Sequence, residues 1–193
     1  FLNSLDKPKK YIPLDISEDY INKISQSFKK KFPKIAITPK GYDFSRNNKL
    51  PFKINSSENI IIFFPGSTIG NFKEKDAVKF LKMLKSKFKA KKIIIGADLV
   101  KDIPTLITAY DDKKGVTAKF NKNILQRINT ELGADINLNY YKHLEIYNNQ
   151  KKRIEMRLKS KKNNNIKING SKYLIKKNEE IHTENSHKYT IKS

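Results

Sequence analysis

The feature that most constrains the fold is a short apolar strand that runs directly into a loop of small residues. Residues 60–64 read Ile-Ile-Ile-Phe-Phe, and Pro65 and Gly66 end the run. A run of this length suits a strand that is buried on both faces, and it is far too short to span a membrane. Small residues then let the backbone approach a ligand, and Asn71 closes the loop. Open α/β sheets bind ligands at such places, outside the carboxyl ends of their strands.

The elements around this strand predict a doubly wound sheet. We expect a short strand at 11–16, a helix that Ser17 caps and that reaches Phe32, and a weak strand at 34–38. After Asn71 we expect an amphipathic helix, followed by a buried strand at 92–96. The apolar residues of that helix recur at helical spacing: Ala77, Phe80, Leu81, Leu84 and Phe88. Strands that alternate with helices are typical of α/β folds.

The alternation of strands and helices stops near residue 100. A second helix is predicted by five apolar residues on one side, with Gly133 ending it: Phe120, Ile124, Leu125, Ile128 and Leu132. Ile154, Met156 and Leu158 share one face of a strand, and 166–175 and 179–189 read as further antiparallel strands. We therefore divide the chain into a doubly wound core, residues 1–99, and an α+β subdomain, residues 100–193.

Composition allows real hydrophobic cores and leaves one rival function open. The chain has 193 residues, of which 37% are hydrophobic, and a formal net charge of +22. Such a charge would favour nucleic acid or an anionic membrane as a partner. The excess is Lys rather than Arg, however, and no aromatic residues are interleaved along a basic groove. We favour a solvated surface, with a Lys-rich nucleic-acid-binding module as the alternative.

Other residue types exclude several kinds of site. The chain has no Cys, which excludes disulfides and thiolate metal sites. Its imidazoles are His143, His182 and His187, and they lack the spacing of metal ligands, so we expect no metal. No signal peptide or apolar span of membrane length is visible. We expect a cytoplasmic monomer without a membrane partner.

Six blocks in order carry a resemblance to a known family. They read FFPGSTIGN, GADLVKD, AYDDKKGVTAKFN, INTELGAD, RIEMRL and HTENSHKY. From about Tyr11 to Tyr189 the chain resembles the S-adenosylmethionine-dependent L-histidine Nα-methyltransferases of ergothioneine biosynthesis. The resemblance implies a class I methyltransferase fold, Rossmann-like, with an inserted α+β substrate-binding subdomain. It also implies S-adenosyl-L-methionine as cofactor, L-histidine as substrate, and trimethylhistidine (hercynine) as product.

The resemblance also bears on how much of such an enzyme this chain represents. The chain opens at Phe1 rather than at Met. Members of the family carry a Gly-rich cofactor loop before this point and closing strands after the HTENSHKY block. We therefore expect a fragment that is inactive alone.

Three residues are expected to bind the cofactor. Asp15 ends the first strand, where a carboxylate can accept hydrogen bonds from both hydroxyls of a ribose. The resemblance implies this role for Asp15, and it implies that Asp43 accepts from the adenine amino group while Phe44 flanks the ring. A helix-capping role for Asp15 and a turn role for Asp43 are the alternatives.

The loop and the following subdomain supply the residues expected to hold the amino acid backbone. The amide of Asn71 offers a donor and an acceptor, which suits an α-amino group and a carboxylate together. The resemblance implies that task for Asn71, and it implies that Gly66 leaves room for the substrate while Tyr110 donates to its carboxylate. The alternatives are a loop residue for Asn71 and a half-buried core residue for Tyr110.

Glu184 and Ser186 are the residues expected to recognise the substrate side chain. They lie two apart on a predicted strand, so both point to one face. A carboxylate and a hydroxyl can pair with the two nitrogens of an imidazole, and Met156 can form an apolar wall beneath the ring. The alternatives are an exposed Glu with a surface Ser, or an enzyme that methylates another amino acid. We expect His182 on the same face and His187 on the opposite face, and we assign neither a catalytic role.

Overall fold

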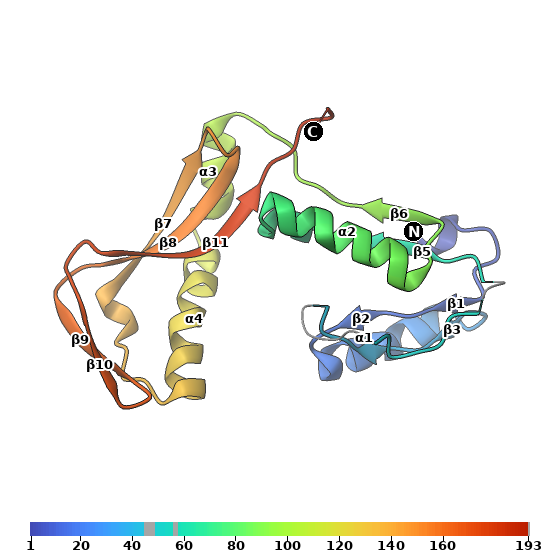
Figure 1. Ribbon diagram of the computed structural model, residues 1–193, viewed down its shortest axis with the longest axis horizontal. Helices are drawn as coiled ribbons and strands as arrows, with labels where there is room; N and C mark the ends of the chain where they lie inside the picture. The colour runs from blue at the N-terminus through green and yellow to red at the C-terminus, as the bar shows by residue number, and fades with distance from the viewer. Residues whose placement is uncertain (45–48, 56–57, 193) are drawn as a thin grey trace. The chain divides into compact units, whose positions relative to one another are not determined.

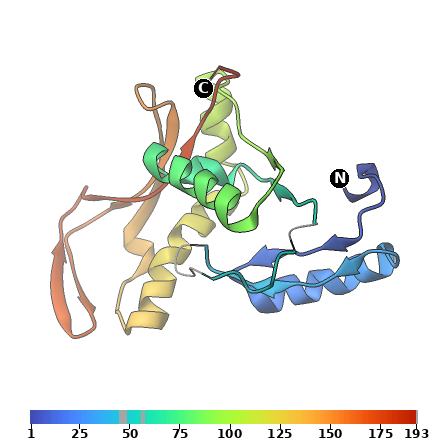
Figure 2. The ribbon, with the colours of Figure 1, turned by 45° about the vertical axis from the view of Figure 1, so that its right-hand side comes forward.

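A computed structural model describes residues 1–44, 49–55 and 58–192 of the chain. It is a mixed α/β protein (Figures 1 and 2). The chain divides into two compact units. The first comprises Phe1–Ile60 and Leu84–Ala90, and the second comprises Ile61–Met83 and Lys91–Ser193.

The first unit is built on a parallel β-α-β arrangement. Strands β1 (Lys10–Tyr11) and β2 (Leu14–Asp15) pair in parallel with β3 (Ala36–Ile37) and β4 (Lys40–Gly41), after the short helix η1 (Leu2–Ser4). Helix α1 (Glu18–Lys31) connects the two pairs of strands and buries Ile21 against them. The predicted strands and helix are confirmed, with the second strand ending a few residues later than expected.

The start of α1 differs from the prediction. Ser17 occupies the N-cap position, but its side chain makes no capping hydrogen bond. Instead the Oδ1 atom of Asp15 accepts a hydrogen bond from the Ser17 amide at 2.9 Å. The expected Ser17 side-chain cap is therefore wrong, because a carboxylate two residues earlier already stabilises this turn.

The second unit begins with another parallel pair. Strand β5 (Ile61–Phe64) pairs with β6 (Lys92–Ile95), and between them in the sequence lie helices η2 (Thr68–Asn71) and α2 (Glu74–Phe88), of which the residues up to Met83 belong to this unit. The Phe80 ring of α2 packs 5.0 Å from the Phe64 ring. The expected burial of the strand on both faces is wrong, since Ile61 is 40% exposed and Phe63 41% exposed. Within the described part of the chain β5 pairs only with β6, and α2 covers one face.

The rest of the second unit is an antiparallel sheet covered by two helices. The sheet order is β11 (Glu180–His187), β8 (Arg153–Ser160) and β7 (Tyr141–Asn148), and the short helix η3 (Leu138–Tyr140) leads into β7. Helices α3 (Ile103–Tyr110) and α4 (Val116–Leu132) pack on one face of this sheet (Figure 1). Two clusters form the core, Leu106 with Ile154 and Met156, and Leu125 with Tyr141 and Leu158.

Helix α4 ends where predicted, but most of its predicted apolar residues are not buried. Gly133 terminates it with φ of 60°, as expected. Of its five predicted apolar residues only Leu125 is fully buried, and Phe120 is 61% exposed. Asn121 is buried in the contact with the sheet instead. The spacing of apolar residues could not predict the burial of Asn121, because its amide is polar.

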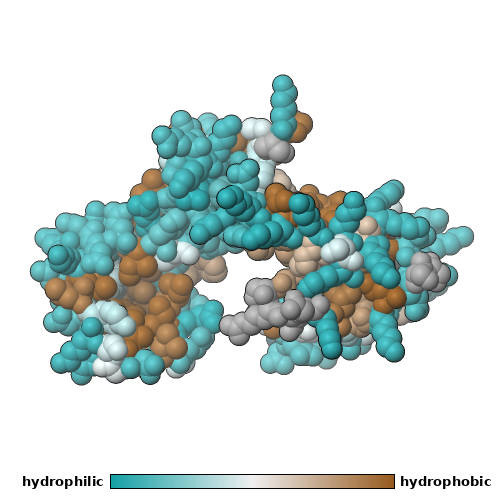
Figure 3. Space-filling model, in the orientation of Figure 1, coloured by the Kyte–Doolittle hydropathy of each residue, from teal (hydrophilic) through white to brown (hydrophobic). Residues whose placement is uncertain are grey.

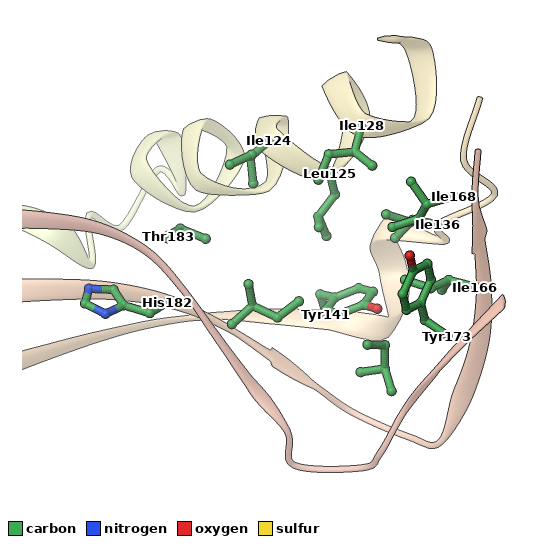
Figure 4. A pocket seen from close by; sticks show the side chains of 12 residues that line it. Ile124, Leu125, Ile128, Ile136, Tyr141, Ile166, Ile168, Tyr173, His182 and Thr183 are labelled. Carbon is green, nitrogen blue, oxygen red and sulfur yellow. The ribbon is translucent and has the colours of Figure 1, made fainter. Parts of the chain in front are cut away.

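The segment 166–175 is a hairpin rather than one strand. Strands β9 (Asn164–Ile168) and β10 (Ser171–Ile175) pair around Asn169 and Gly170, whose φ values are 49° and 80°. Asn-Gly is a strong hairpin signal, and the expectation of a continuous strand overlooked it. The hairpin and α4 enclose an apolar hollow of about 250 Å³, lined by Leu125, Tyr141 and the residues labelled in Figure 4. Hydrophobic surface gathers over the same region in Figure 3.

The opposite face of the three-stranded sheet carries ion pairs. Glu155 is 3% exposed and accepts hydrogen bonds from Arg153 at 2.6 Å and Arg157 at 2.5 Å. Arg157 also pairs with Glu180 at 2.9 Å. Burial alone would raise the pKa of Glu155, but hydrogen bonds from Arg157, Arg153 and Asn148 outweigh it and lower the pKa to about 2.

Candidate functional site

Strand β11 presents Glu184 and Ser186 on the face that α3 covers. Glu184 is opposite Met156 and Ser186 is opposite Ile154, both of which pack against Leu106 of α3. The shared face of Glu184 and Ser186 is therefore as predicted. Figure 1 shows β11 at the edge of its sheet, beside the start of α2.

An irregularity in the ladder changes the expected position of His182. His182 is opposite Arg157 and Glu184 is opposite Met156, so the register shifts at Thr183. Arg157 and Met156 lie on opposite faces of β8, and His182 therefore shares the face of Arg157 rather than that of Glu184. The expectation that His182 lies on the Glu184 face is wrong, because Thr183 is an extra residue in the strand. His187 is opposite Arg153, on the face predicted for it.

The loop after β5 reaches β11 through Asn71. Its Nδ2 atom donates a hydrogen bond to Oε1 of Glu184 at 2.7 Å, across 113 positions of sequence. Gly70 makes this approach possible, since a Cβ there would lie 2.8 Å from the His187 carbonyl oxygen. The Tyr189 hydroxyl donates to the Ile69 carbonyl oxygen at 3.3 Å and adds a second link. Burial raises the pKa of Glu184 above its ordinary value.

Tyr110, the last residue of α3, meets Ser186. Its hydroxyl donates to the Ser186 Oγ atom at 2.6 Å. Behind it, the Tyr110 carbonyl oxygen lies 3.0 Å from Nε2 of His143, and Nδ2 of Asn121 lies 2.8 Å from Nδ1 of the same ring. Since the Asn121 amide nitrogen can only donate, Nδ1 is the acceptor and Nε2 carries the proton. His143 is thus a buried structural residue that supports the end of α3.

The same network holds the irregular residue of β11. Nδ2 of Asn121 donates to the Arg157 carbonyl oxygen at 3.0 Å, which fixes the orientation of that amide because a carbonyl oxygen can only accept, and Thr183 donates to its Oδ1 atom at 2.6 Å. Asn121 therefore connects α4, His143 and Thr183. The position of Glu184 just after the irregularity depends on this network.

Two further residues complete the site, and the sequence analysis did not single them out. The Lys188 ammonium contacts Ser186 Oγ at 2.8 Å, Tyr110 Oη at 2.9 Å and Asp98 Oδ2 at 3.0 Å. A parallel bridge between Leu99 and Tyr189 brings the two segments together. Burial would raise the pKa of Asp98, but hydrogen bonds and charges from Lys101 and Lys188 lower it. Both residues lie in quoted blocks, GADLVKD and HTENSHKY, which was the available signal.

Met156 and Gly66 have clear local explanations. Met156 is 4% exposed and packs with Leu106 and Ile154, next to Glu184 on the neighbouring strand. Gly66 has φ of 79°, a conformation that favours glycine, and a Cβ there would meet only Thr68 Oγ1 at 3.9 Å. Backbone conformation alone therefore accounts for glycine at position 66.

A polar hollow borders Glu184. It measures about 370 Å³ and opens between the start of α2, the β7–β8 turn and β11. It is lined by Lys73, Lys151, Arg153, His182, Thr183, Glu184 and Asn185.

In the first unit, Asp15 ends β2, and Asp43 and Phe44 follow the end of the neighbouring strand β4. Asp15 is opposite Gly41 of β4, and its carbonyl oxygen accepts from the Tyr42 amide at 2.8 Å. The Phe44 ring lies edge-on to the Tyr42 ring, with centroids 4.9 Å apart. Two carboxylates and an aromatic ring thus lie at or just after the ends of neighbouring strands.

Two kinds of site are not seen in the described part of the chain. Among residues 1–44, 49–55 and 58–192 no group of His, Asp or Glu could hold a metal ion. In the same ranges no helix is long and apolar enough to cross a membrane.

Comparison with known proteins identifies the class and then the family. The parallel strand pairs, the antiparallel sheet and the helices packed on them define a mixed α/β protein. The profile of a family described as histidine-specific, SAM-dependent methyltransferases matches residues 1–193. The chain belongs to this family.

Individual relatives agree with the family. The chain is 32% identical over 162 residues to the histidine N-alpha-methyltransferase of Mycolicibacterium smegmatis, which covers 83% of this chain and 49% of that protein. It is 30% identical over 162 residues to the protein of the same name in Mycobacterium tuberculosis, with the same shares covered. It is 33% identical over 135 residues to ergothioneine biosynthesis protein 1 of Neurospora crassa, covering 68% of this chain and 15% of that protein. The chain thus spans about half the length of the two bacterial relatives.

Proposed function

We propose that the protein containing this chain transfers methyl groups from S-adenosyl-L-methionine to the α-amino group of L-histidine and forms trimethylhistidine (hercynine). One observation carries the proposal. Asn71, Tyr110, Glu184 and Ser186 come from three separate segments of the chain, and the contacts Asn71–Glu184 and Tyr110–Ser186 join them in pairs. Family membership supports L-histidine as the substrate of this cluster.

The polar cluster provides groups for both ends of histidine. Oδ1 of Asn71 can accept from the α-amino group, and the second proton of Nδ2 remains for the carboxylate. Glu184 and Ser186 would take the two ring nitrogens, and Met156 would lie under the ring. Tyr110 gives its proton to Ser186, so in this arrangement it supports the hydroxyl rather than the carboxylate.

The first unit would hold the cofactor through Asp15, Asp43 and Phe44. When bound, S-adenosylmethionine supplies an electrophilic methyl group on a sulfonium. Because its leaving group is neutral and the acceptor is an amine, positioning of the α-nitrogen is the main task of this chain. Each transfer also requires the α-nitrogen to lose a proton. We further propose that residues 1–99 belong to a Rossmann-like core and residues 100–193 to the substrate-binding subdomain.

A methyl-transfer assay tests the proposal. The full-length protein is incubated with labelled S-adenosylmethionine and L-histidine, and products are resolved by mass spectrometry. We expect mono-, di- and trimethylated histidine in succession. Transfer to another amino acid with none to histidine would show a related methyltransferase of different specificity. No transfer together with tight, salt-sensitive binding of nucleic acid would favour the basic-module alternative.

A further inference from the structure

Lys188 is a buried cation whose donors are all in use. It follows the last residue of β11, and its side chain is 0% exposed. An ammonium group has three protons to donate. Its three partners lie within hydrogen-bond distance: Ser186 Oγ at 2.8 Å, Tyr110 Oη at 2.9 Å and Asp98 Oδ2 at 3.0 Å.

These contacts restrict what Ser186 can do. Its Oγ atom accepts one hydrogen bond from Lys188 and another from the Tyr110 hydroxyl at 2.6 Å. A hydroxyl has two lone pairs and one proton, so both acceptor positions are filled. Toward any further group, Ser186 can act only as a donor.

Glu184 has the opposite polarity. An ionised carboxylate only accepts, and Oε1 already accepts from Asn71. Oε2 of Glu184 has no hydrogen-bond partner among the residues that the structure describes. On one face of β11 the site therefore offers one acceptor, from Glu184, and one donor, from Ser186.

We propose that Lys188 is a positioning residue that fixes Ser186 as a hydrogen-bond donor, so that the site takes the neutral imidazole ring and rejects the imidazolium. A neutral imidazole has one N–H and one bare nitrogen, which match Glu184 and Ser186. An imidazolium has two N–H groups, and one of them would face an oxygen with no free lone pair. The inference rests on the proposed recognition of histidine.

Charged and titratable groups from several elements surround this cluster. They come from the segment after β6, from α3 and the residue after it, from β7 and from β11. They are Asp98, Lys101, Tyr110, Asp111, His143, Glu145 and Glu184. Only Asp98 and Tyr110, with Ser186, bind the Lys188 ammonium directly.

The test compares histidine binding at two pH values in the full-length protein. Calorimetric titrations with L-histidine at pH 5.5 and 7.5 use the wild type, Lys188→Met, Ser186→Ala and the control Lys101→Met. Lys101 also pairs with Asp98, at 2.9 Å, but it is exposed and does not touch Ser186. A separate titration with S-adenosylmethionine reports whether each variant keeps its fold.

The expected result is a change in the pH profile, which a merely structural role would not cause. With an imidazole pKa of about 6.5, the neutral ring falls about tenfold between pH 7.5 and 5.5, and wild-type affinity should fall with it. In Lys188→Met the freed lone pair of Ser186 can accept from the imidazolium. The ratio of affinities should then shrink to below about threefold, whereas Lys101→Met keeps the wild-type ratio.

Two results would overturn the inference. One is a wild-type pH ratio in a folded Lys188→Met protein. The other is a wild-type pH ratio in Ser186→Ala, because this variant lacks the hydroxyl through which Lys188 is proposed to act. The Ser186→Ala result tests the inference even if Lys188→Met does not fold. Absence of histidine binding by the wild type at both pH values would instead contradict the proposed function.

Discussion

Two carboxylates on opposite faces of one sheet have opposite properties. Glu155 is held by Arg153 and Arg157, and these partners lower its pKa to about 2. Glu184 receives one hydrogen bond from an amide, and burial raises its pKa. The first charge stabilises the fold, and the second opposes folding at high pH. A carboxylate kept without a cationic partner is what a site needs to accept an N–H group from a ligand.

The largest expected effect is on the stabilising face. Glu155→Gln should lower the free energy of unfolding by about 3 kcal/mol, because it leaves buried Arg153 without its ion pair. Chemical denaturation of the full-length protein measures this. The matched control is Glu131→Gln, at an exposed pair with Arg127, which should leave stability almost unchanged. Equal effects of the two substitutions would show that the ion pairs of this face contribute little.

The contribution of the Glu155 charge to stability should disappear at low pH. Since the pKa of Glu155 is about 2 in the folded protein and 4.5 as its reference value, its contribution is complete above pH 4.5 and is lost as pH falls toward 2. Unfolding free energy measured across this range should fall less steeply in Glu155→Gln than in the wild type. Parallel curves would contradict the assigned pKa.

On the other face, substitution should affect binding rather than stability. Glu184→Gln should weaken histidine binding by about tenfold to 100-fold, since hydrogen bonds to charged groups contribute about 1.5–3 kcal/mol. The unfolding free energy of Glu184→Gln should equal that of the wild type at low pH. It should exceed the wild-type value as pH rises through the raised pKa of Glu184, where the wild type gains a buried charge. Glu180→Gln, on the same strand but outside the site, should bind histidine normally. A loss of stability in Glu184→Gln as large as that in Glu155→Gln would remove the contrast between the faces.

The smallest of these effects concerns the contact between η2 and β11. Gly70→Ala would place a methyl group 2.8 Å from the His187 carbonyl oxygen, and the loop must move away. Separation of Asn71 from Glu184 should weaken histidine binding by a few-fold up to about tenfold. Ala at Gly133, which meets nothing within 4 Å, should strain the backbone without changing affinity. Unchanged binding by Gly70→Ala would show that η2 does not position Asn71.

Local patterns in the sequence predicted most elements near the site. The apolar run at 60–64 and the helical spacing of Ala77, Phe80 and Leu84 correspond to β5 and α2. The alternation of Ile154, Met156 and Leu158 also gave the correct face of β8. These predictions are confirmed because the spacing of apolar residues in a strand or helix depends only on residues that are close in the sequence.

The features that the sequence patterns did not predict depend mostly on contacts between residues far apart in the sequence. The register shift at Thr183 requires Asn121 on α4 to hold the extra residue, and no pattern in β11 shows it. Lys188 resembles any other Lys in a Lys-rich sequence, and its burial follows from Asp98, which is 90 positions away. The Asn169-Gly170 turn was predictable and was overlooked.

The most direct test of the histidine site is a comparison of two substrates that differ in their ring nitrogens. The ratio of kcat/KM for L-histidine over L-phenylalanine is measured in the full-length protein and in Glu184→Gln. We expect the wild type to prefer histidine by at least about 100-fold, because phenylalanine leaves Glu184 and Ser186 unpaired. The preference should fall by at least about tenfold in the variant. Equal use of both amino acids by the wild type, or an undiminished preference in Glu184→Gln, would contradict the proposed site.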